Sequence, residues 1–272
     1  MTKEELRIRF YALQKEYRPI MDFLTEKQYD YPEYLGFDAS PSKLIYQPKV
    51  LFLGYNPAGG KDWWRLDAKH NPHLFLWPHL NEETIFFFKE NSARKQNAKW
   101  FELDKPANNK FPRQMIDLMY ELATKVYPDR SNEKGTNKKP FWAEDFEKSM
   151  VFMNLYPVAT NDGEAMISLF KKVIQQIDIP DSCKQDEWHL RMFFIGIIHQ
   201  MIRLIDPKLI VCMGSQTFHD YTYSPRYKHS INEVFTDSKY DNLIGFSRKG
   251  AWDVNIPNIA KAIYERAYCE KK

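Results

Sequence analysis

The chain has 272 residues, of which 43% are hydrophobic and 28% charged. This size and composition suit one α/β domain over residues 1–272 rather than several independent modules. An aromatic content of 15% supplies enough apolar surface to exclude a disordered chain. No stretch approaches the roughly 18 consecutive apolar residues of a membrane-spanning helix, and the charged N-terminal segment has no apolar leader. We therefore expect a cytoplasmic protein with no membrane partner.

The cysteines and the net charge exclude only a few classes of function. The three cysteines, Cys183, Cys212 and Cys269, are widely spaced. Their number and spacing argue against a disulfide framework, a structural zinc site and a four-cysteine iron–sulfur cluster, and we expect no cofactor and no metal. The formal net charge of +3 permits a nucleic-acid partner without requiring one.

Aromatic residues are the unusual feature of the composition, with 7 Trp, 19 Phe and 16 Tyr. Most of the tryptophans fall in a stretch that is poor in predicted regular structure: Trp63, Trp64, Trp77, Trp100 and Trp142. The pattern predicts an aromatic-rich insertion at about residues 58–110.

Helices and strands alternate along the chain. Apolar residues at helical spacing predict helices over 3–27, interrupted near Pro19, and over 112–127, 164–177, 187–205 and 256–269. Short runs that are apolar on both faces predict buried strands at 49–54, 149–154, 208–214 and 242–246. This order predicts a three-layer α/β/α fold with a central, mostly parallel four-stranded sheet. Ligands of such sheets bind beyond the carboxyl ends of the strands, so the residues that follow each strand are the candidates.

The first strand is followed by Gly54, Tyr55, Asn56 and Pro57. Glycine permits close backbone approach, and the Asn56 carboxamide offers a neutral acceptor and donor that can hold a water molecule. The alternative is an ordinary strand-to-helix turn capped by Asn-Pro. The segment contains neither a phosphate-binding P-loop nor a dinucleotide-binding glycine motif.

The second and third strands end in Asn154 and in Gly214-Ser215. An asparagine can read a carbonyl and an adjacent N–H of a ligand, as the edge of a pyrimidine presents them, or it can bond local turn backbone. We interpret Ser215 as the cap of a following helix.

The fourth strand is followed by Arg248, Lys249, Gly250 and Trp252. A basic pair beside a glycine and a tryptophan suits contact with a phosphate backbone, or a wedge inserted into a duplex. The alternative is a solvated turn with Trp252 packed inward.

Taken together, these strand ends resemble the uracil-DNA glycosylase superfamily, in particular its single-strand-selective monofunctional and mismatch-specific branches. Leu51–Ala58 resembles the GMNPG or GINPG motif that follows an apolar strand there, and Met153–Pro157 resembles the strand ending HNLCP. Arg191, followed by Asp206–Gly214, matches a helix with an early arginine and then a Pro-Lys-Leu-Ile-Val strand. The resemblance depends on the order in which these motifs follow one another along the chain.

The resemblance implies a uracil-DNA-glycosylase-like fold and a monomeric, monofunctional DNA glycosylase of base excision repair. Its partner would be single- or double-stranded DNA, from which a flipped uracil or other deaminated base is hydrolysed. Asn154 would read the base edge and Asn56 would hold the attacking water. Gly54, Tyr55 and Pro57 would line the pocket. An aromatic side chain would cover the ring face, the candidates being Trp63, Trp64, Phe75 and Trp77.

One departure concerns the leaving base. The superfamily places His-Pro-Ser after the fourth strand, whereas this chain has Ser247–Trp252 without histidine or proline. Arg248 or nearby backbone N–H groups would have to stabilise the departing anion. We therefore keep a second hypothesis, a weak or inactive nucleic-acid- or nucleotide-binding protein on the same fold.

A third hypothesis is a hydrolase built on His70, His73 and His79, but these residues lack any metal-binding spacing. Over residues 89–113, seven basic and three acidic residues give a local charge of 7 − 3 = +4, which a DNA footprint or a solvated loop would equally produce.

Overall fold

The structure is a computed structural model, and it describes residues 1–39, 41–42, 44–56, 110–133, 140–226, 230, 233–247 and 254–269. The described residues form two compact units. Unit 1 contains those of 1–46, 54–56 and 153–206, and unit 2 contains those of 47–53, 110–152 and 207–269. No helix in the described ranges is long and apolar enough to cross a membrane.

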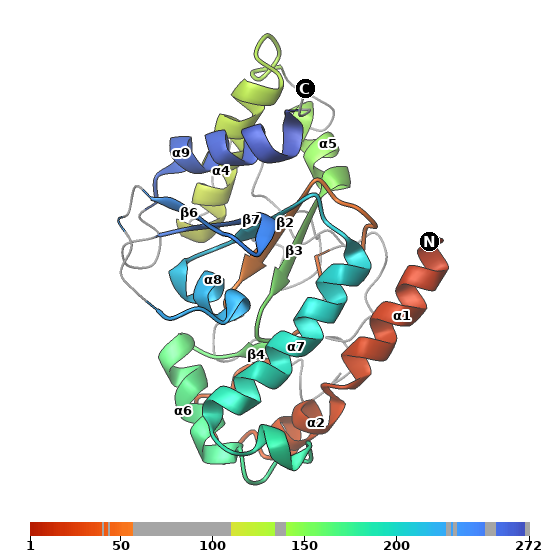
Figure 1. Ribbon diagram of the computed structural model, residues 1–272, viewed down its shortest axis with the longest axis vertical. Coiled ribbons are helices and arrows are strands. Elements are labelled where there is room, and N and C mark those ends of the chain that lie inside the picture. The colour runs from red at the N-terminus through yellow and green to blue at the C-terminus, as the bar shows by residue number, and fades with distance from the viewer. Residues whose placement is uncertain are drawn as a thin grey trace. The chain divides into compact units, whose positions relative to one another are not determined.

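Unit 1 is built on helices packed around aromatic side chains. Its helices are α1 (Lys3–Lys15), α2 (Arg18–Glu26), α6 (Gly163–Val173) and α7 (Glu187–Ile205), with a 3-10 turn at Asp181–Cys183. Helices α1 and α7 lie side by side (Figure 1). Two short strands, β1 (Gly36–Phe37) and β4 (Val158–Ala159), pair antiparallel.

Unit 2 contains a five-stranded mixed sheet in the order β3-β2-β5-β7-β6. The strands are β2 (Val50–Gly54), β3 (Met150–Asn154), β5 (Leu209–Cys212), β6 (Val234–Asp237) and β7 (Tyr240–Phe246). The β2–β5 and β5–β7 pairs are parallel, and β6 pairs antiparallel with β7. The last residues of β2 and β3 belong to unit 1. Because the chain places β3 on one side of β2 and β5 on the other, β2 lies where the strand order reverses, the usual ligand position in open α/β sheets.

Helices cover both faces of the sheet in unit 2 (Figure 1). One face, which includes Phe52 and Val211, packs against α4 (Lys110–Val126), α5 (Trp142–Ser149) and α9 (Ile256–Ile263). Helix α9 continues as a π-helical turn, Tyr264–Tyr268. On the opposite face α8 (Ser215–Thr222) places Phe218 against Gly245. This arrangement confirms the predicted α/β class.

The predicted four-stranded sheet is wrong in detail, because β6 adds an antiparallel edge strand. The strands at 49–54, 149–154, 208–214 and 242–246 are confirmed to within a few residues. The predicted break near Pro19 is also confirmed: α1 ends at Lys15, and Pro19 lies in the first turn of α2, where proline's missing N–H costs no helical bond. Trp142 is not part of an irregular segment but begins α5 and is fully buried. The single-domain prediction stays a prediction.

Candidate functional site

The carboxyl ends of β2 and β3 are joined by backbone hydrogen bonds that continue beyond the strands. Leu155 N donates to Gly54 O at 2.8 Å, and Tyr156 N donates to Tyr55 O at 2.9 Å. These bonds hold the segment 54–56 beside the segment 154–156 within unit 1. Two predicted site residues, Asn56 and Asn154, therefore lie at the ends of neighbouring strands.

The Asn56 carboxamide is half-buried and is oriented by the segment that follows β3. Its Nδ2 donates to Thr160 Oγ1 at 2.9 Å and to Val158 O at 3.3 Å. Thr160 is fully buried, and its hydroxyl donates to Asp162 O at 2.6 Å, so it must act as an acceptor toward Asn56. Because both partners accept, the amide nitrogen is assigned to this side and Oδ1 to the other. Asn56 thus presents an acceptor away from Thr160.

Asn154 lies across the backbone of Gly54. A Cβ added to Gly54 would stand 2.6 Å from Asn154 Oδ1, a separation that real Cβ atoms do not show. Glycine at position 54 therefore leaves room for the Asn154 carboxamide in its present position. Within the part of the chain that the structure describes, the half-buried Asn154 carboxamide has no hydrogen-bond partner. Its donor and acceptor groups can meet a ligand.

Two tyrosine rings support these strand ends. Tyr55 and Tyr156 are buried and pack edge to face, with ring centroids 5.0 Å apart and planes at 74°. Tyr156 also packs against Phe170 and Phe194 of unit 1. Tyr55 is thus a core residue next to Asn56, and its place in the lining of a ligand pocket stays a prediction.

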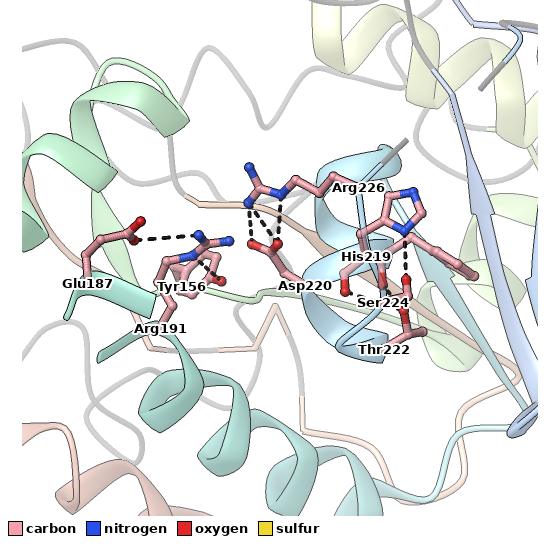
Figure 2. Close-up of polar contacts among 9 residues, drawn as sticks. Tyr156, Glu187, Arg191, His219, Asp220, Thr222, Ser224 and Arg226 are labelled. Carbon is pink, nitrogen blue, oxygen red and sulfur yellow. Dashed lines mark hydrogen bonds and ion pairs between the residues drawn. The ribbon is translucent and has the colours of Figure 1, made fainter. Parts of the chain in front are cut away.

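Arg191 of α7 is buried, and its side chain lies beside that of Tyr156 (Figure 2). Its Nε donates to the Tyr156 hydroxyl at 3.1 Å, and its Nη1 lies 3.6 Å from Glu187 Oε2. The guanidinium carbon lies 4.6 Å from the centre of the Trp188 ring. In the sequence Arg191 is recognisable only as part of a motif, because its link to Tyr156 depends on the fold.

The first turn of α7, which carries Arg191, is fixed by an N-cap. Asp186 accepts a hydrogen bond from His189 N at 2.9 Å. That backbone hydrogen bond, followed by the one to the His189 ring, lowers the pKa of the Asp186 carboxyl. The ionised carboxylate also complements the positive end of the helix dipole.

The third strand end lies in unit 2 and differs from the prediction. Helix α8 begins at Ser215, and its N-cap is Gly214, with no side-chain capping bond. Gly214 has a φ of 125°, which favours glycine. The interpretation of Ser215 as the cap is therefore wrong. The cap position has a positive φ, which glycine adopts readily, and it is occupied by Gly214, the residue before Ser215.

A polar cluster at the other end of α8 was not predicted. His219 Nδ1 is hydrogen-bonded to Ser224 Oγ at 2.7 Å, and Ser224 Oγ to Thr222 Oγ1 at 2.8 Å (Figure 2). In the same loop Arg226 forms a two-pronged ion pair with the buried Asp220 carboxylate. The only sequence signal for this cluster is the presence of Ser and His residue types near each other in the chain.

This cluster fastens the loop after α8, and the surroundings of Ser224 and His219 do not suit a nucleophilic dyad. Ser224 follows the helix C-terminus, whose carbonyl groups disfavour a developing oxyanion. His219 is 1% exposed and stacks parallel to Phe235, leaving its ring little access to a substrate.

Several predicted site residues lie outside the described residues: Pro57, Trp63, Trp64, Phe75, Arg248, Lys249, Gly250 and Trp252. The same holds for Trp77 and for His70, His73 and His79. The prediction that Arg248 and its neighbours contact DNA stays a prediction. Across the described ranges, no group of three or more His, Cys, Asp or Glu side chains could hold a metal ion.

No protein-family model matches the chain, and a search of curated proteins finds no match.

Proposed function

We propose that the chain is a monofunctional DNA glycosylase, with a uracil-DNA-glycosylase-like fold, that hydrolyses the N-glycosidic bond of uracil or another deaminated base. The observation that carries the proposal is the pair of carboxamides at neighbouring strand ends. The Asn154 carboxamide makes no hydrogen bond to a described residue, and Asn56 is held with its Oδ1 turned away from Thr160. Asn56 follows β2 and Asn154 ends β3, and the carboxyl ends of strands are where open α/β sheets bind their ligands.

Each asparagine has a distinct part in the proposed reaction. Asn154 reads the edge of a base that has been flipped out of its stack. Asn56 Oδ1 accepts a hydrogen bond from a water molecule and directs its oxygen to C1′. The electron pair of the broken C1′–N bond leaves with the base, which takes up the proton released by the attacking water. A neutral amide can orient the water because its oxygen accepts a hydrogen bond without taking up the proton.

Stabilisation of the departing base decides the expected rate. The motif histidine of the resembled superfamily is absent from Ser247–Trp252, which leaves Arg248 and backbone N–H groups as donors. Loss of one preorganised donor typically lowers the rate about 100- to 1000-fold. We therefore expect slow base release. The absence of the histidine also favours the second candidate, a protein that binds the base without hydrolysis.

Base release from oligonucleotides separates these candidates. Single- and double-stranded DNA containing uracil, xanthine or hypoxanthine is incubated with the protein and cleaved at abasic sites with alkali. The proposal predicts release by the wild type and by the control Asn132→Ala, an exposed asparagine of unit 2. Asn56→Ala should lose release while still binding the strand. Binding of a base-containing strand without release supports the second candidate, and neither binding nor release rejects both.

A further inference from the structure

Arg191 is a charged side chain that the proposed reaction does not use. It is 5% exposed. Guanidinium remains protonated in proteins, so burial here removes a full charge from water. Replacing a buried ion pair by apolar residues is often neutral or stabilising, so its burial is weak evidence that Arg191 serves stability alone.

The contacts of Arg191 lead to the candidate site through one residue. Its Nε donates to the hydroxyl of the fully buried Tyr156 at 3.1 Å. The Tyr156 ring packs edge to face on Tyr55, and Tyr156 N donates to Tyr55 O. Tyr55 immediately precedes Asn56, and Tyr156 is two residues beyond Asn154. The two rings therefore fix the backbone that carries both asparagines.

Arg191 is itself held on more than one side. Its guanidinium carbon lies 4.6 Å from the Trp188 ring centre, and Nη1 lies 3.6 Å from Glu187 Oε2 (Figure 2). A planar guanidinium can stack on an aromatic ring and donate in its plane at the same time, which an ammonium cannot. These contacts direct Nε toward the Tyr156 hydroxyl.

We propose that Arg191 is a positioning residue which, through the Tyr156 hydroxyl, sets the position of the backbone that carries the Asn56 and Asn154 carboxamides at the ends of β2 and β3. This inference rests on the proposed function, because it concerns the two asparagines that would meet the ligand. Asn154 has no described hydrogen-bond partner, so its orientation depends on the backbone beneath it. Small displacements of positioned groups can cost about 100-fold in rate.

The test measures the NMR resonances of the asparagine side chains directly. Protein labelled with ¹⁵N-asparagine gives side-chain NH₂ resonances, and Asn56→Ser and Asn154→Ser assign two of them. Tyr156→Phe and Arg191→Met should shift both resonances. The double variant should shift them no further, because both changes break one connection. Arg203→Met, an exposed arginine of the same helix, is the control and should leave them in place. Arg191→Lys should behave like Arg191→Met.

Base release is measured on the same variants. Tyr156→Phe and Arg191→Met should lower kcat about tenfold, within the range that misplacement produces, without a matching rise in KM. If Arg191→Met does not fold, Tyr156→Phe carries the test, because phenylalanine keeps the ring in the core. Unmoved Asn56 and Asn154 resonances in folded Tyr156→Phe protein would overturn the inference. Shifted resonances in a protein that releases no base would support positioning and reject the proposed hydrolysis.

Discussion

Substitution of Thr160 by valine isolates the hydrogen bonds that orient Asn56. Thr160 is fully buried, and valine has nearly its shape, so the change removes the hydroxyl and little else. Two hydrogen bonds are lost, the 2.9 Å bond from Asn56 Nδ2 and the 2.6 Å bond to Asp162 O. At about 0.5–1.5 kcal/mol each, their loss should lower the free energy of unfolding by about 1–3 kcal/mol.

Thr160→Ser is the matched control. It keeps the hydroxyl and removes one buried methyl group, which costs about 0.8 kcal/mol. Urea unfolding followed by tryptophan fluorescence gives both free energies, provided that the dependence on urea concentration is the same for the two proteins. The Asn56 side-chain resonance should move in Thr160→Val and stay near its wild-type position in Thr160→Ser. A valine variant as stable as the wild type, with an unmoved Asn56 resonance, would refute the assigned orientation.

Three further changes test the packing described above. Gly54→Ala should weaken binding of a uracil-containing strand about tenfold, the equivalent of one hydrogen bond of about 1.4 kcal/mol, because the new Cβ displaces the Asn154 carboxamide; unchanged binding would count against that contact. Gly245→Ala places a Cβ 2.7 Å from the Phe218 ring and should destabilise by about 1–3 kcal/mol in urea unfolding. A Cβ at Gly196 has no described atom within 4 Å, so Gly196→Ala should raise the free energy of unfolding by about 0.5–1 kcal/mol. Equal changes in the free energy of unfolding for Gly196→Ala and Gly245→Ala would contradict the packing. Burial raises the pKa of the Cys212 thiol, so a disulfide reagent at pH 8 should modify Cys183 and Cys269 in the native protein and Cys212 only after unfolding, and equal rates for all three would be inconsistent with this fold.

The elements that could be predicted are those with strong local patterns. Helix α7 has a wide apolar stripe over 19 residues and ends where Asp206 takes a left-handed conformation before Pro207. Strands β2, β3 and β5 are apolar on both faces because both faces are buried. Strand β6 is short, and it is only partly buried at the edge of the sheet, so its sequence carries little signal.

Side-chain contacts at the candidate site were beyond sequence reasoning for a different reason. Residue types and strand ends place Asn56 and Asn154 at one edge of the sheet. Asn56 is bonded to Thr160, 104 residues away, and Tyr156 is bonded to Arg191, on a helix of the same unit. Such pairs depend on how segments distant in sequence pack together. The same holds for the pairing of β1 with β4, which joins Gly36 to Ala159.

The most direct test of the proposed function compares base release by the wild type, Asn56→Ala and Asn154→Ala on a uracil-containing single strand. The proposal predicts slow release by the wild type and at least about a 100-fold loss in Asn56→Ala, the scale expected when a group that positions the reacting water is removed. It also predicts that Asn154→Ala binds the uracil strand no better than a thymine strand. Release by Asn56→Ala at the wild-type rate, or no release by the wild type from any substrate, would contradict it.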